Sequence, residues 1–118
     1  MWMGTDDPPP PRLKARIVAR PTLRQYMQEH PEAADALKGW ERTVTDLSFH
    51  SFAELRAQVP SVDYVNDTYL VWNINGNAYR LITLVRWTRP VLYLHRFMTH
   101  AEYNTWSDLT RKAKKKKR

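Results

Sequence analysis

The sequence predicts an α+β domain in which a mainly antiparallel sheet carries helices packed on one of its faces. Apolar residues recur at helical spacing in the first half of the chain, and β-branched and aromatic runs fill the second half. The pair Asn75-Gly76, which is favoured in tight hairpin turns, separates two of these runs. At 118 residues, the chain has the length of a single domain with a hydrophobic core.

The two ends of the chain are predicted to lie outside the folded domain. Residues 1–12 contain four consecutive prolines and few apolar side chains, so we expect a disordered leader. Residues 111–118 contain seven basic residues and no acid, which predicts a basic disordered tail. Residues 13–110 remain as the domain, and residues 13–19 are predicted to form its short first strand.

Two helices are predicted between the first strand and residue 47. Pro21, followed by Thr22 and Gln25 in the spacing of a capping box, predicts a helix to about Glu29. Residues 31–47 are predicted to form the second helix, because apolar residues recur there three and four positions apart, with acids on the opposite side. The apolar stripe comprises Ala33, Ala36, Leu37, Trp40, Val44 and Leu47.

Two further helices are predicted to begin at capping boxes. Ser51 and Glu54 have the spacing of such a box and start a short helix that Pro60 ends. Thr99 and Glu102 repeat the pattern and start the last helix, which we expect to continue to about the end of the domain.

Three strands are predicted between these helices. Residues 61–67 are expected to be a linker, and residues 69–74 and 78–87 the two strands of a hairpin around the Asn-Gly pair. A turn at residues 88–90 leads into a third strand over residues 91–98.

The register of the last two strands decides which side chains share a face with Arg80. A three-residue connection places Arg80 opposite Met98, on the face that carries Arg96. A connection of two or four residues places Arg80 opposite Phe97, on the face that carries His95. The sequence leaves both registers open.

Charge is distributed unevenly along the chain, whose net charge is +7. Outside the basic tail, 12 basic residues balance 12 acidic ones. Residues 29–67 are predominantly acidic, whereas residues 69–101 contain no carboxylate. The strand segment carries Arg80, Arg86, Arg89 and Arg96. Because a guanidinium group matches the geometry of phosphate, this pattern predicts a cationic sheet surface; the alternative is a solvated face without a ligand.

Composition excludes several classes of site. The chain has no cysteine, and its four histidines lie far apart without carboxylates at ligand spacing, so we expect no disulfide, metal or cofactor. No apolar run reaches the roughly 20 residues of a membrane span, and the first residues lack the pattern of a signal peptide. We therefore expect a cytoplasmic protein without a membrane partner.

His100 and Tyr103 follow the last predicted strand and add groups that transfer protons. Next to arginines, they point to cleavage of RNA. Each has a structural alternative, because His100 could be a partly exposed hydrogen-bonding residue and Tyr103 could pack on the sheet. His95 alternates with aromatic residues along its strand and is expected to be structural.

Residues 75–81 (NGNAYRL) and 97–103 (FMTHAEY) resemble the HigB toxins, a branch of the RelE-like, ribosome-dependent mRNA interferases. The resemblance extends from about residue 14 to residue 106. It implies a toxin that cuts mRNA in the ribosomal A site without a metal, by attack of a ribose 2′-OH on the neighbouring phosphate. It also implies a HigA-type helix-turn-helix antitoxin, through which alone the toxin would reach operator DNA.

The resemblance also suggests roles for individual residues. The candidate catalytic residues are Arg80, Arg96, His100 and Tyr103. The candidate contacts to RNA phosphates are Arg86, Arg89, Lys112, Lys114, Lys115, Lys116 and Lys117. For the lysines of the tail, the alternative is a solvated end without a ligand.

Two other functions fit parts of the pattern. A non-catalytic module that binds RNA or DNA would use the same cations without a proton-transfer pair. A ParE-like toxin would use the same fold to inhibit gyrase and would leave messages intact.

Overall fold

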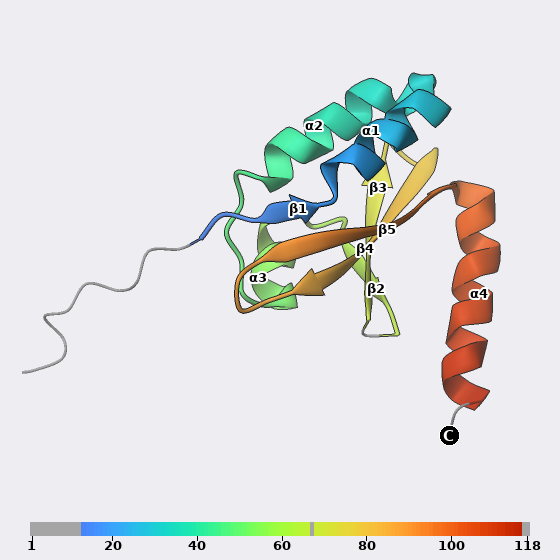
Figure 1. Cartoon of the computed structure of the whole chain (residues 1–118). Helices are drawn as coiled ribbons and strands as arrows, with labels where there is room; N and C mark the ends of the chain where they lie inside the picture. Colours follow the sequence, from blue (N-terminus) through green and yellow to red (C-terminus); the bar gives the residue numbers. More distant parts are fainter. Residues whose placement is uncertain (1–12, 67, 117–118) are drawn as a thin grey trace, which may run out of the picture.

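The computed structural model of the chain describes residues 13–66 and 68–116, so the predicted leader lies outside the described residues (Figure 1). It is an α+β fold with a five-stranded sheet in the order β1-β5-β4-β3-β2. The strands are β1 (Arg16–Val18), β2 (Asp63–Val65), β3 (Tyr69–Ile74), β4 (Tyr79–Arg86) and β5 (Val91–Thr99). The helices are α1 (Arg20–Glu29), α2 (Ala34–Val44), α3 (Phe52–Gln58) and α4 (His100–Lys116), and a 3-10 turn (Pro31–Ala33) precedes α2.

The sheet is mainly antiparallel, as predicted. β2, β3, β4 and β5 pair antiparallel with their neighbours, and β1 pairs parallel with β5. The expected linker over residues 61–67 was wrong in part, because it contains the edge strand β2. Only three residues of this strand pair with β3, and Val65 among them is fully buried. So short a run carries too little alternation to be recognised from sequence.

The hairpin of β3 and β4 forms around Asn75-Gly76, as predicted. Both residues have positive φ, 56° and 66°, the region that asparagine and glycine tolerate best. The connection is longer than a two-residue turn, because Ile74 pairs with Tyr79 and the NH of Ala78 donates to the carbonyl of Asn75 at 3.2 Å.

Two of the three predicted capping boxes hold their helices. The Ser51 hydroxyl accepts from the NH of Glu54 at 3.1 Å, and the Thr99 hydroxyl accepts from the NH of Glu102 at 3.2 Å. The carboxylate of Glu102 also accepts from the NH of Thr99 at 2.9 Å, which completes a reciprocal box at the start of α4.

The capping box predicted for α1 was wrong. The helix begins at Arg20 after Ala19, which makes no side-chain cap, and Thr22 lies inside the first turn. Pro21 occupies that first turn, where its missing NH is not needed, so the helix extends one residue further back than expected.

The predicted ends of α2 and α4 also differ from the structure. α2 ends at Val44 and not at residue 47. At this end, the hydroxyl of Thr45 donates to the carbonyl of Glu41 at 2.8 Å. α4 continues past residue 110 to Lys116, so the expected disorder was wrong for residues 111–116. No glycine or proline stops this helix, and lysine, arginine and alanine favour helical backbone.

The helices α1, α2 and α3 pack on one face of the sheet, as predicted, and α4 adds cover to part of the opposite face. α1, α2 and α3 bury Leu23, Leu37 and Leu55 in the larger cluster, which includes Leu81 of β4. α4 packs on the opposite face over a second cluster. That cluster comprises Val65, Val71, Ile82 and Met98, with Tyr69, Tyr103 and Trp106 against it. No helix in the described part of the chain is both long and apolar enough to cross a bilayer.

A bulge in β5 combines the two registers that the sequence left open. Arg86 pairs with Val91, so the connection has four residues, yet Arg80 pairs with Met98 and not with Phe97. The register shifts after Ile82, which pairs with Arg96, because Thr83 pairs with Leu94 and His95 is the extra residue. Arg80 consequently shares a face with Arg96, since paired residues lie on the same side of a sheet.

We expect the Thr99→Ala substitution to lower the free energy of unfolding by about 1 kcal/mol, because it removes the hydroxyl that caps α4. Thermal or urea unfolding measures the change. Thr43→Ala, at an exposed position within α2, is the matched control and should change stability by less than about 0.5 kcal/mol. Equal effects of the two substitutions would contradict the role of the cap.

Candidate active site

Arg80 is held in place by its neighbour Tyr79. The Tyr79 ring is buried on the α1–α3 face, where it stacks on Phe97 at 4.9 Å and its hydroxyl donates to the carboxylate of Glu32. Because side chains alternate along a strand, Arg80 points to the opposite face. Its Nη1 donates to the carbonyls of Tyr79 at 3.0 Å and Asn77 at 3.3 Å, which leaves Nη2 and Nε without a partner among the described residues.

Tyr103 lies next to this guanidinium group. The carbon of the Arg80 guanidinium lies 5.9 Å from the centre of the Tyr103 ring, within the range of a cation–π contact. The half-buried ring also packs against the second cluster, beneath α4. Both predicted roles for Tyr103 are therefore compatible with its position, because the ring packs on the sheet and also contacts Arg80.

His100 lies at the same end of the sheet, but its imidazole stands apart. Its backbone NH donates to the carbonyl of Ala78 at 3.1 Å, directly after the pair formed by Tyr79 and Thr99. The side chain is exposed and makes no hydrogen bond, ion pair or ring contact within the described residues. It is therefore open to a ligand, and its catalytic role stays a prediction.

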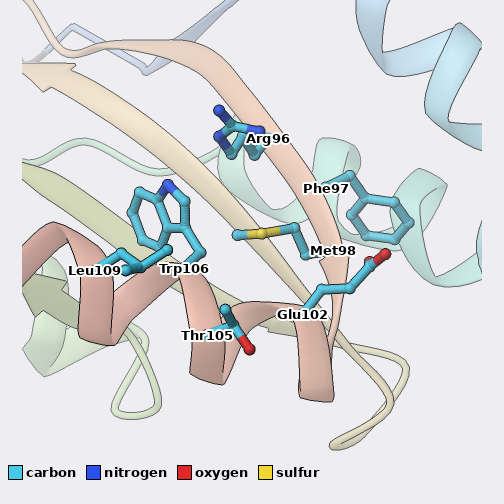
Figure 2. A pocket seen from close by; sticks show the side chains of 7 residues that line it. All are labelled: Arg96, Phe97, Met98, Glu102, Thr105, Trp106 and Leu109. Carbon is cyan, nitrogen blue, oxygen red and sulfur yellow. The ribbon is translucent and has the colours of Figure 1, made fainter.

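Arg96 lines a groove of about 550 Å³ between β5 and α4. Arg96, Phe97 and Met98 line it from the strand, and the remaining lining residues belong to the helix. Those residues are Glu102, Thr105, Trp106 and Leu109. Figure 2 shows Met98 pointing toward Trp106, whereas the Phe97 ring points away from it. Arg80 and Tyr103 do not line this groove, so the structure divides the predicted catalytic set into Arg80 with Tyr103 and, separately, Arg96.

His95, for which a structural role was predicted, lies on the α4 face. Its ring stacks on Tyr69 at 5.0 Å and lies 6.2 Å from Trp106. Partial burial, and then the charge of Arg96, lower the pKa of His95 from its usual value, which favours the neutral imidazole. A bulge depends on pairing between distant residues, and nothing in the local sequence marks it.

The predicted phosphate contacts lie elsewhere. Arg86 ends β4 and Arg89 lies in the following connection, both exposed, at the opposite end of β4 from Arg80. Arg86 lies six positions after Arg80, which corresponds to about 20 Å along a strand. Lys112 is exposed on α4; the positions of its neighbours' side chains, from Lys114 to Lys117, fall outside the described part.

We expect stability to fall with acid through His95. A histidine whose pKa is lowered by folding takes up a proton more readily in the unfolded chain. Its contribution to the free energy of unfolding is therefore complete above about pH 6.5 and is lost as the pH falls through the pKa of the folded state. His95→Phe keeps an aromatic ring against Tyr69 and Trp106 but does not titrate. Melting temperatures are measured from about pH 7.5 down to about pH 5, a range that brackets the ordinary pKa of histidine. They should fall more steeply for the unsubstituted protein than for the His95→Phe variant. Parallel profiles would contradict this.

Comparison with known proteins identifies the family. The model of the HigB toxins, described as a RelE-like toxic component of a toxin-antitoxin system, matches residues 33–106, more than half of the chain. The "mRNA interferase toxin HigB" of Escherichia coli (strain K12) is 26% identical over 102 residues, which cover 85% of this chain and 98% of that protein. The "mRNA interferase HigB" of Escherichia coli O157:H7 and that of Shigella flexneri match over the same shares at the same identity. The resemblance of residues 75–81 and 97–103 is thus confirmed, and the chain belongs to the HigB toxin family.

Proposed function

We propose that the chain is a ribosome-dependent mRNA interferase, which cuts translated messages in the ribosomal A site. The observation that carries the proposal is the Arg80–Tyr103 contact, at the end of the sheet where the exposed His100 begins α4. All three residues lie within the span matched by the family, and the relatives are named mRNA interferases. A guanidinium group with two nitrogens unpartnered among the described residues, next to a phenol and at the same end of the sheet as an exposed imidazole, suits a phosphate that reacts by proton transfer.

The proposed reaction requires no group beyond the RNA and these side chains. The ribose 2′-OH loses its proton and attacks the adjacent phosphorus, the bond from phosphorus to the 5′-oxygen breaks, and that oxygen takes up a proton. The products are a 2′,3′-cyclic phosphate and a 5′-OH. Arg80 would stabilise the negative charge that develops on the phosphorane. His100 and Tyr103 would handle the two protons, one as acceptor and one as donor.

Binding of the RNA would be shared among cations outside this group. Arg96 in the groove, with Arg86 and Arg89 at the far end of β4, adds positive charge to the α4 face. The lysines from Lys112 to Lys117 would add attraction through counterion release, without sequence preference. Such a toxin acts where ribosomes are, in the cytoplasm. We propose a HigA-type helix-turn-helix antitoxin as its partner, and operator binding only through that partner.

Expression of the chain without an antitoxin is expected to stop growth and to produce cuts in messages that are being translated. Mapping of RNA 5′ ends after induction measures the cuts, and the same RNA mixed with the purified chain but without ribosomes should stay intact. Arrested cells with uncut messages would contradict the proposal and favour inhibition of gyrase. Cleavage of free RNA would contradict the dependence on ribosomes.

Substitutions at Arg80 and His100 should abolish toxicity without unfolding the protein. Arg80→Ala and His100→Ala are each expected to lower the cleavage rate by about 10²- to 10⁴-fold. Tyr103→Phe removes only the hydroxyl, so a comparable loss would assign a chemical role to Tyr103, whereas full activity would leave it a packing residue. Single-turnover cleavage on programmed ribosomes measures the rates.

The matched control is Arg42→Ala, which removes an exposed arginine from α2 on the other face. It should retain activity. Each variant is expected to stay folded, with a loss of no more than about 1–2 kcal/mol in the free energy of unfolding. His100 and Arg42 are exposed, Tyr103→Phe keeps the ring, and Arg80→Ala removes one cation–π contact and two hydrogen bonds to carbonyls. An active His100→Ala variant, or a loss of toxicity that tracks unfolding, would remove that residue from the mechanism.

A further inference from the structure

Three arginines from three separate elements meet at one corner of the α4 face. Arg16 comes from β1, Arg86 from the end of β4, and Arg89 from the connection between β4 and β5. They line a hollow of about 190 Å³, which we call the arginine pocket. Its remaining lining residues are Leu13, Lys14, Pro90 and Val91.

Backbone pairing fixes two of these arginines on either side of Val91. Arg16 pairs with Val91 from β1, and Arg86 pairs with the same residue from β4. The NH of Arg16 also donates to the carbonyl of Pro90 at 3.0 Å. Strands lie about 4.8 Å apart, so the Cα atoms of Arg16 and Arg86 are separated by roughly 10 Å, with both side chains on the same face. An anion between them is within reach of both guanidinium groups.

The charge of the pocket is not neutralised from within the described residues. No acidic residue lines it, and the three arginines form no ion pair or hydrogen bond through their side chains in the described part of the chain. Lys14 differs, because its ammonium group bonds to the carboxylate of Asp46 at 2.9 Å; this bond raises the pKa of Lys14 and lowers that of Asp46. Three unpaired guanidinium groups repel one another, so an anion that binds among them is favoured.

We propose that the arginine pocket binds a phosphodiester group of RNA at a site separate from Arg80 and Tyr103. Pockets for drug-sized molecules typically measure about 300–1,000 Å³, so a hollow of 190 Å³ suits a phosphate group better than a whole nucleotide. The distance of about 20 Å along β4 allows the pocket to hold RNA without contact to the reacting phosphate. The choice of RNA as the source of the phosphate rests on the proposed function, whereas the anion site rests on the arginines.

The decisive variant replaces Arg16, Arg86 and Arg89 with glutamine. Its control replaces Arg24, Arg42 and Arg56, three exposed arginines of α1, α2 and α3, and so removes the same net charge from the other face. Affinity for oligouridylate and for message-programmed ribosomes is measured over a salt series. We expect the pocket variant to lose affinity and to show a log-log salt slope that is smaller by about 0.7 for each single-strand phosphate released. The control should keep the slope of the unsubstituted chain.

Equal slopes for the pocket variant and its control would overturn the proposal. The proposal would also be overturned if the three arginines were needed to bind inorganic phosphate or anionic lipid vesicles but were not needed to bind either RNA probe. The single substitutions Arg86→Gln and Arg89→Gln, both at exposed positions, give the same test should the triple variant unfold.

The test separates this proposal from that of mRNA cleavage. The positions of the cuts should be the same for the pocket variant and the unsubstituted chain, because the reacting phosphate lies elsewhere, whereas the concentration of chain needed for half-maximal cleavage should rise. A chain that binds RNA through the pocket but cuts no message would retain this proposal and lose the other. If the chain cuts messages and the pocket variant binds RNA as tightly as the unsubstituted chain, the proposal of mRNA cleavage is retained and that of the arginine pocket is lost.

Discussion

The antiparallel pairing of β4 with β5 is the interaction on which the rest of the structure depends. β5 joins β1 along its other edge and leads directly into the capped start of α4. β4 pairs with β3 and carries Arg80 at one end and Arg86 at the other. Each of these two strands therefore presents apolar residues to α1–α3 on one side and cations to the α4 face on the other. A change in their register would exchange the two sets.

α4 divides the cationic face into areas of different chemistry. Tyr103, on one side of the helix, adjoins Arg80. Trp106 lines the groove that contains Arg96 and also contacts Tyr69. The helix thus does more than complete the core, since it supplies an aromatic neighbour to two different parts of the sheet. The remaining cations, at the far corner beside β1, are the furthest along β4 from the proposed reacting centre.

Local sequence rules predicted the elements whose cause is local. The Asn75-Gly76 hairpin and the caps at Ser51 and Thr99 depend on a few adjacent residues, and each was confirmed. The edge strand β2, the bulge at His95 and the cover that α4 adds to part of the second face depend on pairing and packing between distant segments, and each was missed. Arg80 and Tyr103 were both predicted to belong to one site, but the contact between them was not predicted. Arg16 was not predicted at all, because its neighbours in the arginine pocket lie some 70 residues further along the chain.

The bulge in β5 has a consequence for the length of the chain. Ile82 pairs with Arg96 and Thr83 pairs with Leu94, so His95 has no partner in β4, and the neighbouring residues of β4 do not need it for pairing. Removal of His95 would therefore convert the bulge into a regular ladder and leave each of these cross-strand partners in place. Removal of a paired residue of β5 away from the bulge would shift part of the strand by one position and turn side chains to the wrong face. His95 thus marks a position where a relative could be one residue shorter and still align Arg80 with Met98.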